Sequence, residues 1–168
     1  MTGLLDGAPA EIHSYTKSTG KSSTRYTRYT VSFPSIGIGL RLQRQSGMGM
    51  FLKVLGTQDI VIGEPVFDEA FIVQASDPQA ARAVLGAGTT MVLNRLIALH
   101  PEIVVFDDRI VLDRRATVRD ADTLISTLRR LGSAAGALVD AGQSEALNKL
   151  VEQRLSGALP NDYEPDPE

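Results

Sequence analysis

Three glycine-containing segments have spacings close to those of phosphate-binding motifs, and each fails at a required position. Residues 86–91 (Gly-Ala-Gly-Thr-Thr-Met) begin like a dinucleotide-binding fingerprint, but Met91 stands where the third glycine belongs. Gly20-Lys21-Ser22 imitates the end of a P-loop, but the required earlier glycine is missing. Gly37-Ile38-Gly39 fits a strand with a closely packed neighbour. These segments predict no bound cofactor.

Nucleophilic catalysis needs a base held against a hydroxyl or thiol, and the chain has few bases to offer. It contains no cysteine and only two histidines, His13 and His100. His100 ends an apolar helical pattern just before Pro101, where a cation would suit the helix C-terminus. His13 stands in a weak strand pattern, and no Gly-x-Ser-x-Gly elbow is present. The sequence therefore predicts no catalytic residue.

The acidic residues Asp107, Asp108 and Asp113 could suggest a site for a hard cation. A tight hairpin explains the first two more simply, because aspartate favours turn conformations. Asp68 and Glu69 are expected on opposite faces of one strand, so they cannot act together as a carboxylate pair. We therefore expect no metal site.

Charge is distributed unevenly along the chain, whose formal net charge is −3. Residues 12–58 contain seven cations and no acidic residue, whereas residues 59–113 contain nine acids and three arginines. Blocks of opposite sign can attract each other within the fold, between copies, or toward an outside anion. The candidate contacts for an anion or a lipid headgroup are Arg25, Arg28, Arg41, Arg44 and Lys53. The alternative is an ordinary solvated sheet face.

Alternating apolar and polar residues predict the strands that would position these side chains. Residues 11–17 alternate weakly, and residues 25–33 alternate clearly, with Arg28 on the polar face. The apolar face of that second strand holds Tyr29, Val31 and Phe33. Residues 36–43 alternate most clearly of all, and the short link at residues 34–35 predicts an antiparallel hairpin with residues 25–33.

The second half of the chain reads as two further strand units and several helices. A strand over 66–75 is expected to place Phe67, Phe71 and Val73 in the core, and residues 103–112 form a second hairpin. Asp77 and the proline after it are a strong helix start. Helical patterns cover residues 47–55, 78–85, 89–99, 120–139 and 144–155, and Gly142 is expected to separate the last two.

These elements predict an α+β fold, with a mainly antiparallel sheet built from hairpins and helices packed on one face. Residues 1–157 form a single domain with its core over about 25–139 and an extra C-terminal helix over about 144–155. Residues 158–168 are acidic and proline-containing, which predicts a disordered tail. No apolar run approaches the ~20 residues that cross a bilayer.

The stretch Gly63-Glu64-Pro65-Val66-Phe67-Asp68-Glu69-Ala70-Phe71-Ile72-Val73, followed by Ser76-Asp77-Pro78, resembles a family of uncharacterised bacterial proteins. In that family a soluble α+β domain follows membrane-spanning helices, and a strand of the form Phe-Asp-x-x-Phe-x-Val leads into Asp-Pro. The resemblance covers residues 25–139 and implies the same fold. It transfers no activity or catalytic residue, and this chain lacks the membrane helices.

Taken together, the sequence predicts a non-enzymatic interaction or scaffolding domain, working in the cytoplasm or at the cytoplasmic face of a membrane. We expect a protein partner or self-association, with an anionic membrane surface as a further option, and no nucleic acid. One alternative is a small-ligand-binding domain or enzyme whose site is not visible in the sequence. Another is a homo-oligomeric structural protein that buries Leu147, Leu150 and Leu155.

Overall fold

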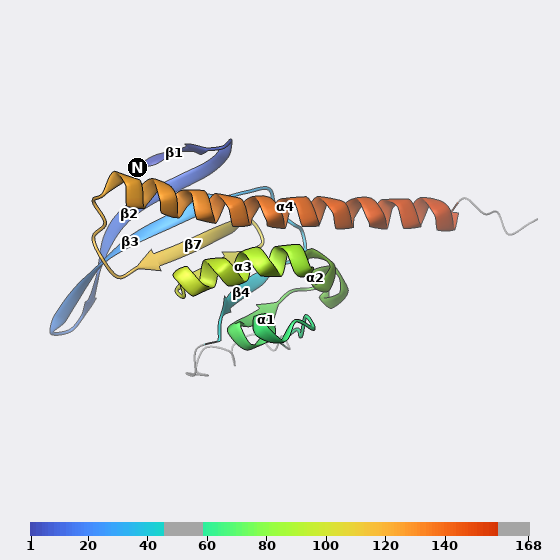
Figure 1. Ribbon diagram of the computed structural model, residues 1–168, viewed down its shortest axis with the longest axis horizontal. Helices are drawn as coiled ribbons and strands as arrows, with labels where there is room; N and C mark the ends of the chain where they lie inside the picture. The colour runs from blue at the N-terminus through green and yellow to red at the C-terminus, as the bar shows by residue number, and fades with distance from the viewer. Residues whose placement is uncertain (46–58, 158–168) are drawn as a thin grey trace, which may run out of the picture.

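The computed structural model of the chain describes residues 1–45 and 59–157, and within them seven strands form one antiparallel sheet (Figure 1). The helices lie over one face of this sheet, which we call the inner face; the opposite face is the outer face. This arrangement confirms the predicted α+β class. None of the described helices is long and apolar enough to cross a membrane.

The first three strands are joined by tight turns. They are β1 (Thr2–Leu5), β2 (Ala8–Thr19) and β3 (Ser22–Ser32). Asp6 and Gly7 have φ of +49° and +85°, and this pair of positive values is what a type I′ hairpin turn requires. The strand predicted over 11–17 is confirmed but is longer, and β1 is an addition that sequence reasoning missed.

The remaining strands are β4 (Arg41–Arg44), β5 (Phe71–Gln74), β6 (Ile103–Phe106) and β7 (Arg109–Arg114). The predicted hairpin over 103–112 is confirmed as β6 and β7. The order across the sheet is β1-β2-β3-β7-β6-β4-β5. Residues that pair across neighbouring strands share a face, so this order decides which side chains meet on the outer face.

The predicted hairpin between residues 25–33 and 36–43 is wrong. β3 pairs with β2 and β7, whereas β4 pairs with β5 and β6, so two strands separate them. Gly37 and Gly39 have φ of +82° and +63°, which breaks the extended chain that the alternation suggested. Only residues 41–44 of the predicted strand are extended in the sheet.

Asp107 explains why this segment forms a loop. Its carboxylate accepts backbone N–H groups from Gly37, Ile38 and Leu40 at 2.9, 3.1 and 2.9 Å. The hydroxyl of Ser35 also bonds to it. A carboxylate that satisfies three otherwise free N–H groups replaces the strand partners of the loop, so the chain can turn here and enter the sheet beyond β6.

The strand predicted over 66–75 is half helix. α1 (Pro65–Ala70) precedes β5, with Pro65 at the start of the helix, where its missing N–H costs nothing. Asp68 accepts the N–H groups of Ile62 and Gly63, each at 2.9 Å, which closes the chain onto the first turn. Phe67 and Phe71 stack at a 4.5 Å centroid distance in the core, so their predicted burial is confirmed.

α2 (Pro78–Val84) and α3 (Ala87–Leu99) follow the sequence expectations closely. The Asp77 side chain accepts N–H groups from Gln79 and Ala80 at 2.9 and 3.0 Å, as a helix cap should. The helix predicted over 47–55, together with Lys53, lies outside the described residues.

α4 (Ala121–Gly157) is one continuous helix where two were predicted. Gly142 does not end it. A β-carbon at Gly142 would lie 2.9 Å from Cγ2 of Ile36, so this glycine permits a close crossing of the helix over the loop before β4. The predicted stripe of Leu147, Leu150 and Leu155 lies among side chains outside the described part of the structure.

The core fills the space between the inner face and the helices. α4 packs on β1, β3 and β7, and also on α2 and α3. The largest fully buried side chains include Tyr29, Phe67, Leu93, Ile110 and Leu131. The helices therefore leave the outer face uncovered, along with any strand that extends past them.

Candidate functional site

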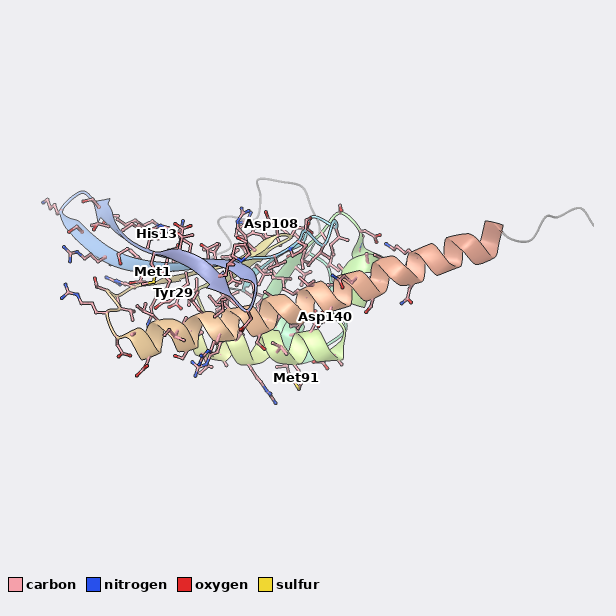
Figure 2. All side chains as sticks on the ribbon, turned by 90° about the horizontal axis from the view of Figure 1, so that it is seen from above. Met1, His13, Tyr29, Met91, Asp108 and Asp140 are labelled. Atoms are coloured by element: carbon pink, nitrogen blue, oxygen red, sulfur yellow. The ribbon has the colours of Figure 1, made fainter. Side chains whose placement is uncertain are left out.

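A two-stranded arm extends beyond the rest of the sheet. β2 pairs with β1 only over Ala8–Glu11, and β3 pairs with β7 only over Thr27–Ser32. Residues 15–26 pair with each other alone, with Tyr15 opposite Tyr26 and Thr19 opposite Ser22. We call residues 15–26 the arm; its strands are about 17 Å long at the usual rise per residue. The arm and the free end of α4 lie at opposite ends of the molecule (Figures 1 and 2).

Specific contacts hold the arm together, because an isolated hairpin is at best marginally stable in water. Gly20 takes φ +59° at the first position of the two-residue turn, as a type II′ turn requires. The rings of Tyr15 and Tyr26 stack across the strands with centroids 5.4 Å apart and planes 17° apart. Near the tip, the hydroxyls of Thr19 and Ser22 bond at 3.0 Å.

The two tyrosine rings are also covered by cations. The guanidinium carbon of Arg28 lies 5.1 Å from the centroid of Tyr15, and Nζ of Lys17 lies 5.7 Å from that of Tyr26. Cation–π contacts at such partly exposed sites contribute about 0.5–1 kcal/mol each. Tyr15 loses solvent here, which raises the pKa of its hydroxyl. The rings therefore stiffen the arm and do not stand free as a stacking platform.

The arm itself is basic. Its twelve residues include Lys17, Lys21 and Arg25, six serines or threonines, and no acid. The three cations are exposed, and none of them belongs to an ion pair in the described part of the chain. A projecting element with unpaired cations and hydroxyl donors is suited to binding an anion.

More cations gather where the arm joins the body. Thr27 Oγ1 donates to the Ala116 carbonyl at 2.8 Å and accepts from the Val118 N–H at 3.1 Å, which fixes the β7–α4 connection against β3. This connection carries three exposed arginines, which we call the basal arginines: Arg114, Arg115 and Arg119. Asp120, at the start of α4, is engaged as a helix cap by the Thr123 N–H at 2.8 Å.

The structure separates the five candidate contacts that the sequence suggested. Arg25 lies on the arm, on the inner-face side. Arg28 and Arg41 lie on the outer face but are separated by β7 and β6. Arg44 lines a hollow with Glu69, on the side of the helices. Lys53 lies outside the described residues, so only Arg25 joins the arm.

The outer face neutralises much of its own charge. Arg28 donates to both carboxylate oxygens of Asp113, Nε–Oδ1 at 2.7 Å and Nη2–Oδ2 at 2.5 Å. Hydrogen bonding to Asp113 raises the pKa of Arg28, and the same bond lowers the pKa of Asp113. Arg109 pairs with Asp108 at 2.8 Å. The basic and acidic blocks of the sequence thus meet within the fold on this face.

A catalytic grouping does not form around His100, Asp107 and Arg109. His100 follows α3 at one end of β6, and Asp107 follows the other end. Burial, reinforced by Arg130 and Arg114, lowers the pKa of His100, so the expected cationic helix cap is wrong and the imidazole is neutral at pH 7. In the described residues no cluster of His, Asp or Glu has the geometry of a metal site.

A groove of about 700 Å³ lies between the β1–β2 turn and α4. Its walls are mostly apolar, and its charged lining residues are Asp6, Arg129 and Asp140. No described side chain with catalytic chemistry opens into it. It is therefore a weaker candidate than the arm.

Sequence reasoning found Lys17, Lys21 and Arg25 only as part of a diffuse basic block. The missing signal was strand length: the Thr/Ser-rich residues 16–24 have no apolar alternation, so they read as a turn. The basal arginines were missed because they are 90 residues away in sequence and reach the arm only through β3–β7 pairing.

Comparison of the chain with protein-family models, with curated proteins and with solved structures finds no match.

Proposed function

We propose that this chain is a non-enzymatic interaction domain that binds an anionic partner through the arm and the basal arginines. The observation that carries the proposal is the projection of residues 15–26 beyond β1 and β7 with three exposed cations. Six cations at one end of the molecule, from the arm and from residues 114–119, set up a local positive field on a chain whose net charge is −3.

The stability of the arm supports a role in binding. A ribbon with no third strand and no apolar aliphatic residue contributes little to the core. Folding such a segment still costs conformational entropy. The cation–π and stacking contacts of Tyr15 and Tyr26 keep it ordered, which lowers the entropic cost of binding when the partner arrives.

A test uses retention on a heparin column as a general polyanion probe. The variant carries Lys17→Gln, Lys21→Gln and Arg25→Gln, and its matched control carries Arg41→Gln, Arg44→Gln and Arg95→Gln, three exposed cations away from the arm. The proposal expects the wild type and the control to elute at similar salt, and the arm variant to elute much earlier. Equal retention of all three proteins would refute a role for the arm.

Anionic membrane surfaces are one partner of this kind, and the resemblance to membrane-anchored bacterial proteins makes them worth testing. Each cation near an anionic surface is worth about 1 kcal/mol. Co-sedimentation with phosphatidylcholine vesicles, with and without phosphatidylserine, measures this directly. Binding only to the anionic vesicles, weakened by salt, supports a position at a membrane; no co-sedimentation removes the membrane from the proposal.

A second candidate is a protein-docking surface on the outer face. Phe106 is flanked by Arg41 and Arg109, whose guanidinium carbons lie 5.7 and 4.7 Å from its ring centroid. Aromatic and arginine side chains are enriched at protein interfaces, and the pairing of Arg28 and Arg109 with acids suits a protein better than a polyanion. Weakened capture of a partner by Phe106→Ala, with arm variants unaffected, would favour this candidate.

A further inference from the structure

We infer that the anionic partner of the arm is duplex DNA, with the arm entering the major groove and the basal arginines contacting the flanking phosphates. This inference rests on the proposed function, because it names the class of the anion. Sequence analysis led us to expect no nucleic acid, since seven cations are spread over 47 residues; the fold changes the density by gathering six cations at one end.

The shape of the arm fits a groove. A two-stranded β-ribbon is one of the elements that the major groove of B-DNA admits, at a width of about 12 Å and a depth of about 8.5 Å. The free length of the arm, about 17 Å, exceeds that depth. No helix covers either side of residues 16–25, all but one of which are exposed.

The chemistry of the arm fits phosphates and base edges. Lys, Arg, Ser, Thr and backbone N–H groups are the usual donors to phosphate oxygens. The arm offers Lys17, Lys21 and Arg25 together with hydroxyls near the tip, such as Ser18 and Ser23. The basal arginines extend the positive surface away from the groove, toward the backbone on either side.

Two other polyanions fit less well. Single strands are held largely by bases stacked on exposed aromatic rings, and here Tyr15 and Tyr26 stack on each other beneath Arg28 and Lys17. Interfacial membrane binding draws on apolar side chains that enter the acyl region, and residues 16–25 contain none. A duplex asks only for cations, hydroxyls and a narrow shape.

Fluorescence anisotropy with a short labelled DNA duplex tests the inference. Six phosphate contacts predict a fall in affinity of about 10³-fold between about 50 and 200 mM salt, from a slope of about −0.9 per contact. The variant with Lys17→Gln, Lys21→Gln and Arg25→Gln keeps three contacts, so the fall shrinks to about 40-fold. The control with Arg41→Gln, Arg44→Gln and Arg95→Gln should behave as the wild type does.

The outcomes separate the two proposals. Retention on heparin or on anionic vesicles without duplex binding overturns the inference and leaves the proposed function standing. Duplex binding with the same salt slope in wild type and arm variant also overturns it, because the contacts then lie elsewhere. Failure to bind any polyanion contradicts both. Thermal melting of each variant, expected to match the wild type because the substituted side chains are exposed, shows that all three proteins are folded.

Discussion

Arg28 and Asp113 form a two-point ion pair across β3 and β7, with donor–acceptor distances of 2.7 and 2.5 Å. One partner comes from the acid-free first third of the chain and the other from the acid-rich part, 85 residues later. The pair stands at the base of the arm, where Arg28 also covers the ring of Tyr15. It therefore couples the arm to the body of the sheet.

Replacing Asp113 with Asn should lower the free energy of unfolding at pH 7 by about 1 kcal/mol, because both side chains are about one-third exposed and solvent screens the pair. The pKa of Asp113 is depressed in the folded state, so its contribution is present above the ordinary aspartate value of about 4 and is lost as the pH falls below it. Urea unfolding of both proteins at neutral and acidic pH checks this. A difference that stays constant down to low pH would contradict the assignment.

Asp107→Asn should cost about 2–3 kcal/mol, because one amide oxygen cannot accept from Gly37, Ile38 and Leu40 together with the Ser35 hydroxyl. Asp108→Asn is the matched control. Asp108 bonds only to the exposed Arg109 beside it in the described structure, so its loss should cost less than about 0.5 kcal/mol. Equal effects in equilibrium unfolding would mean that the loop at 37–40 does not depend on Asp107.

Two glycines of α4 should respond differently to alanine. Gly136 has no neighbour within 4 Å of where a β-carbon would stand, so Gly136→Ala should stabilise the helix by about 0.5–1 kcal/mol. At Gly142 the new methyl would meet Ile36 at 2.9 Å, which offsets that gain. Thermal melting should place Gly136→Ala above Gly142→Ala. The reverse order would mean that α4 does not cross Ile36 this closely.

His100 should make the fold sensitive to mild acid. It is buried, and its Nε2 has no hydrogen-bond partner in the described structure. Because its pKa is lowered on folding, the unfolded chain binds the proton more tightly, so stability is highest above about pH 6.5 and falls as the pH drops below that value. His100→Gln should flatten the loss between about pH 7.5 and 5.5. An unchanged pH dependence in this variant would place the titrating group elsewhere.

Local sequence patterns predicted the elements whose formation depends on neighbouring residues. The alternation of residues 25–33, the hairpin over 103–112 and the Asp77 cap all appear in the structure. The pattern over 36–43 failed because a side chain 67 residues away, Asp107, provides bonds that a strand partner would otherwise make. Periodicity carries no information about such distant partners.

The candidate site was less accessible to prediction than the fold. Lys17, Lys21 and Arg25 were visible as basic residues, but their projection depends on where β1 and β7 stop pairing. The basal arginines join them only through the register that sets Arg114 opposite Thr27. Both facts are properties of the sheet, and neither is written in the local composition of residues 12–58.

Shortening the arm tests its role in anion binding most directly. Replacing residues 16–25 by Asn-Gly joins Tyr15 to Tyr26 through a type I′ turn and leaves the rest of the sheet in place. With unchanged secondary structure and near-unchanged melting, this chain should pass through a heparin column at a salt concentration that retains the wild type. Retention equal to that of the wild type would contradict the account.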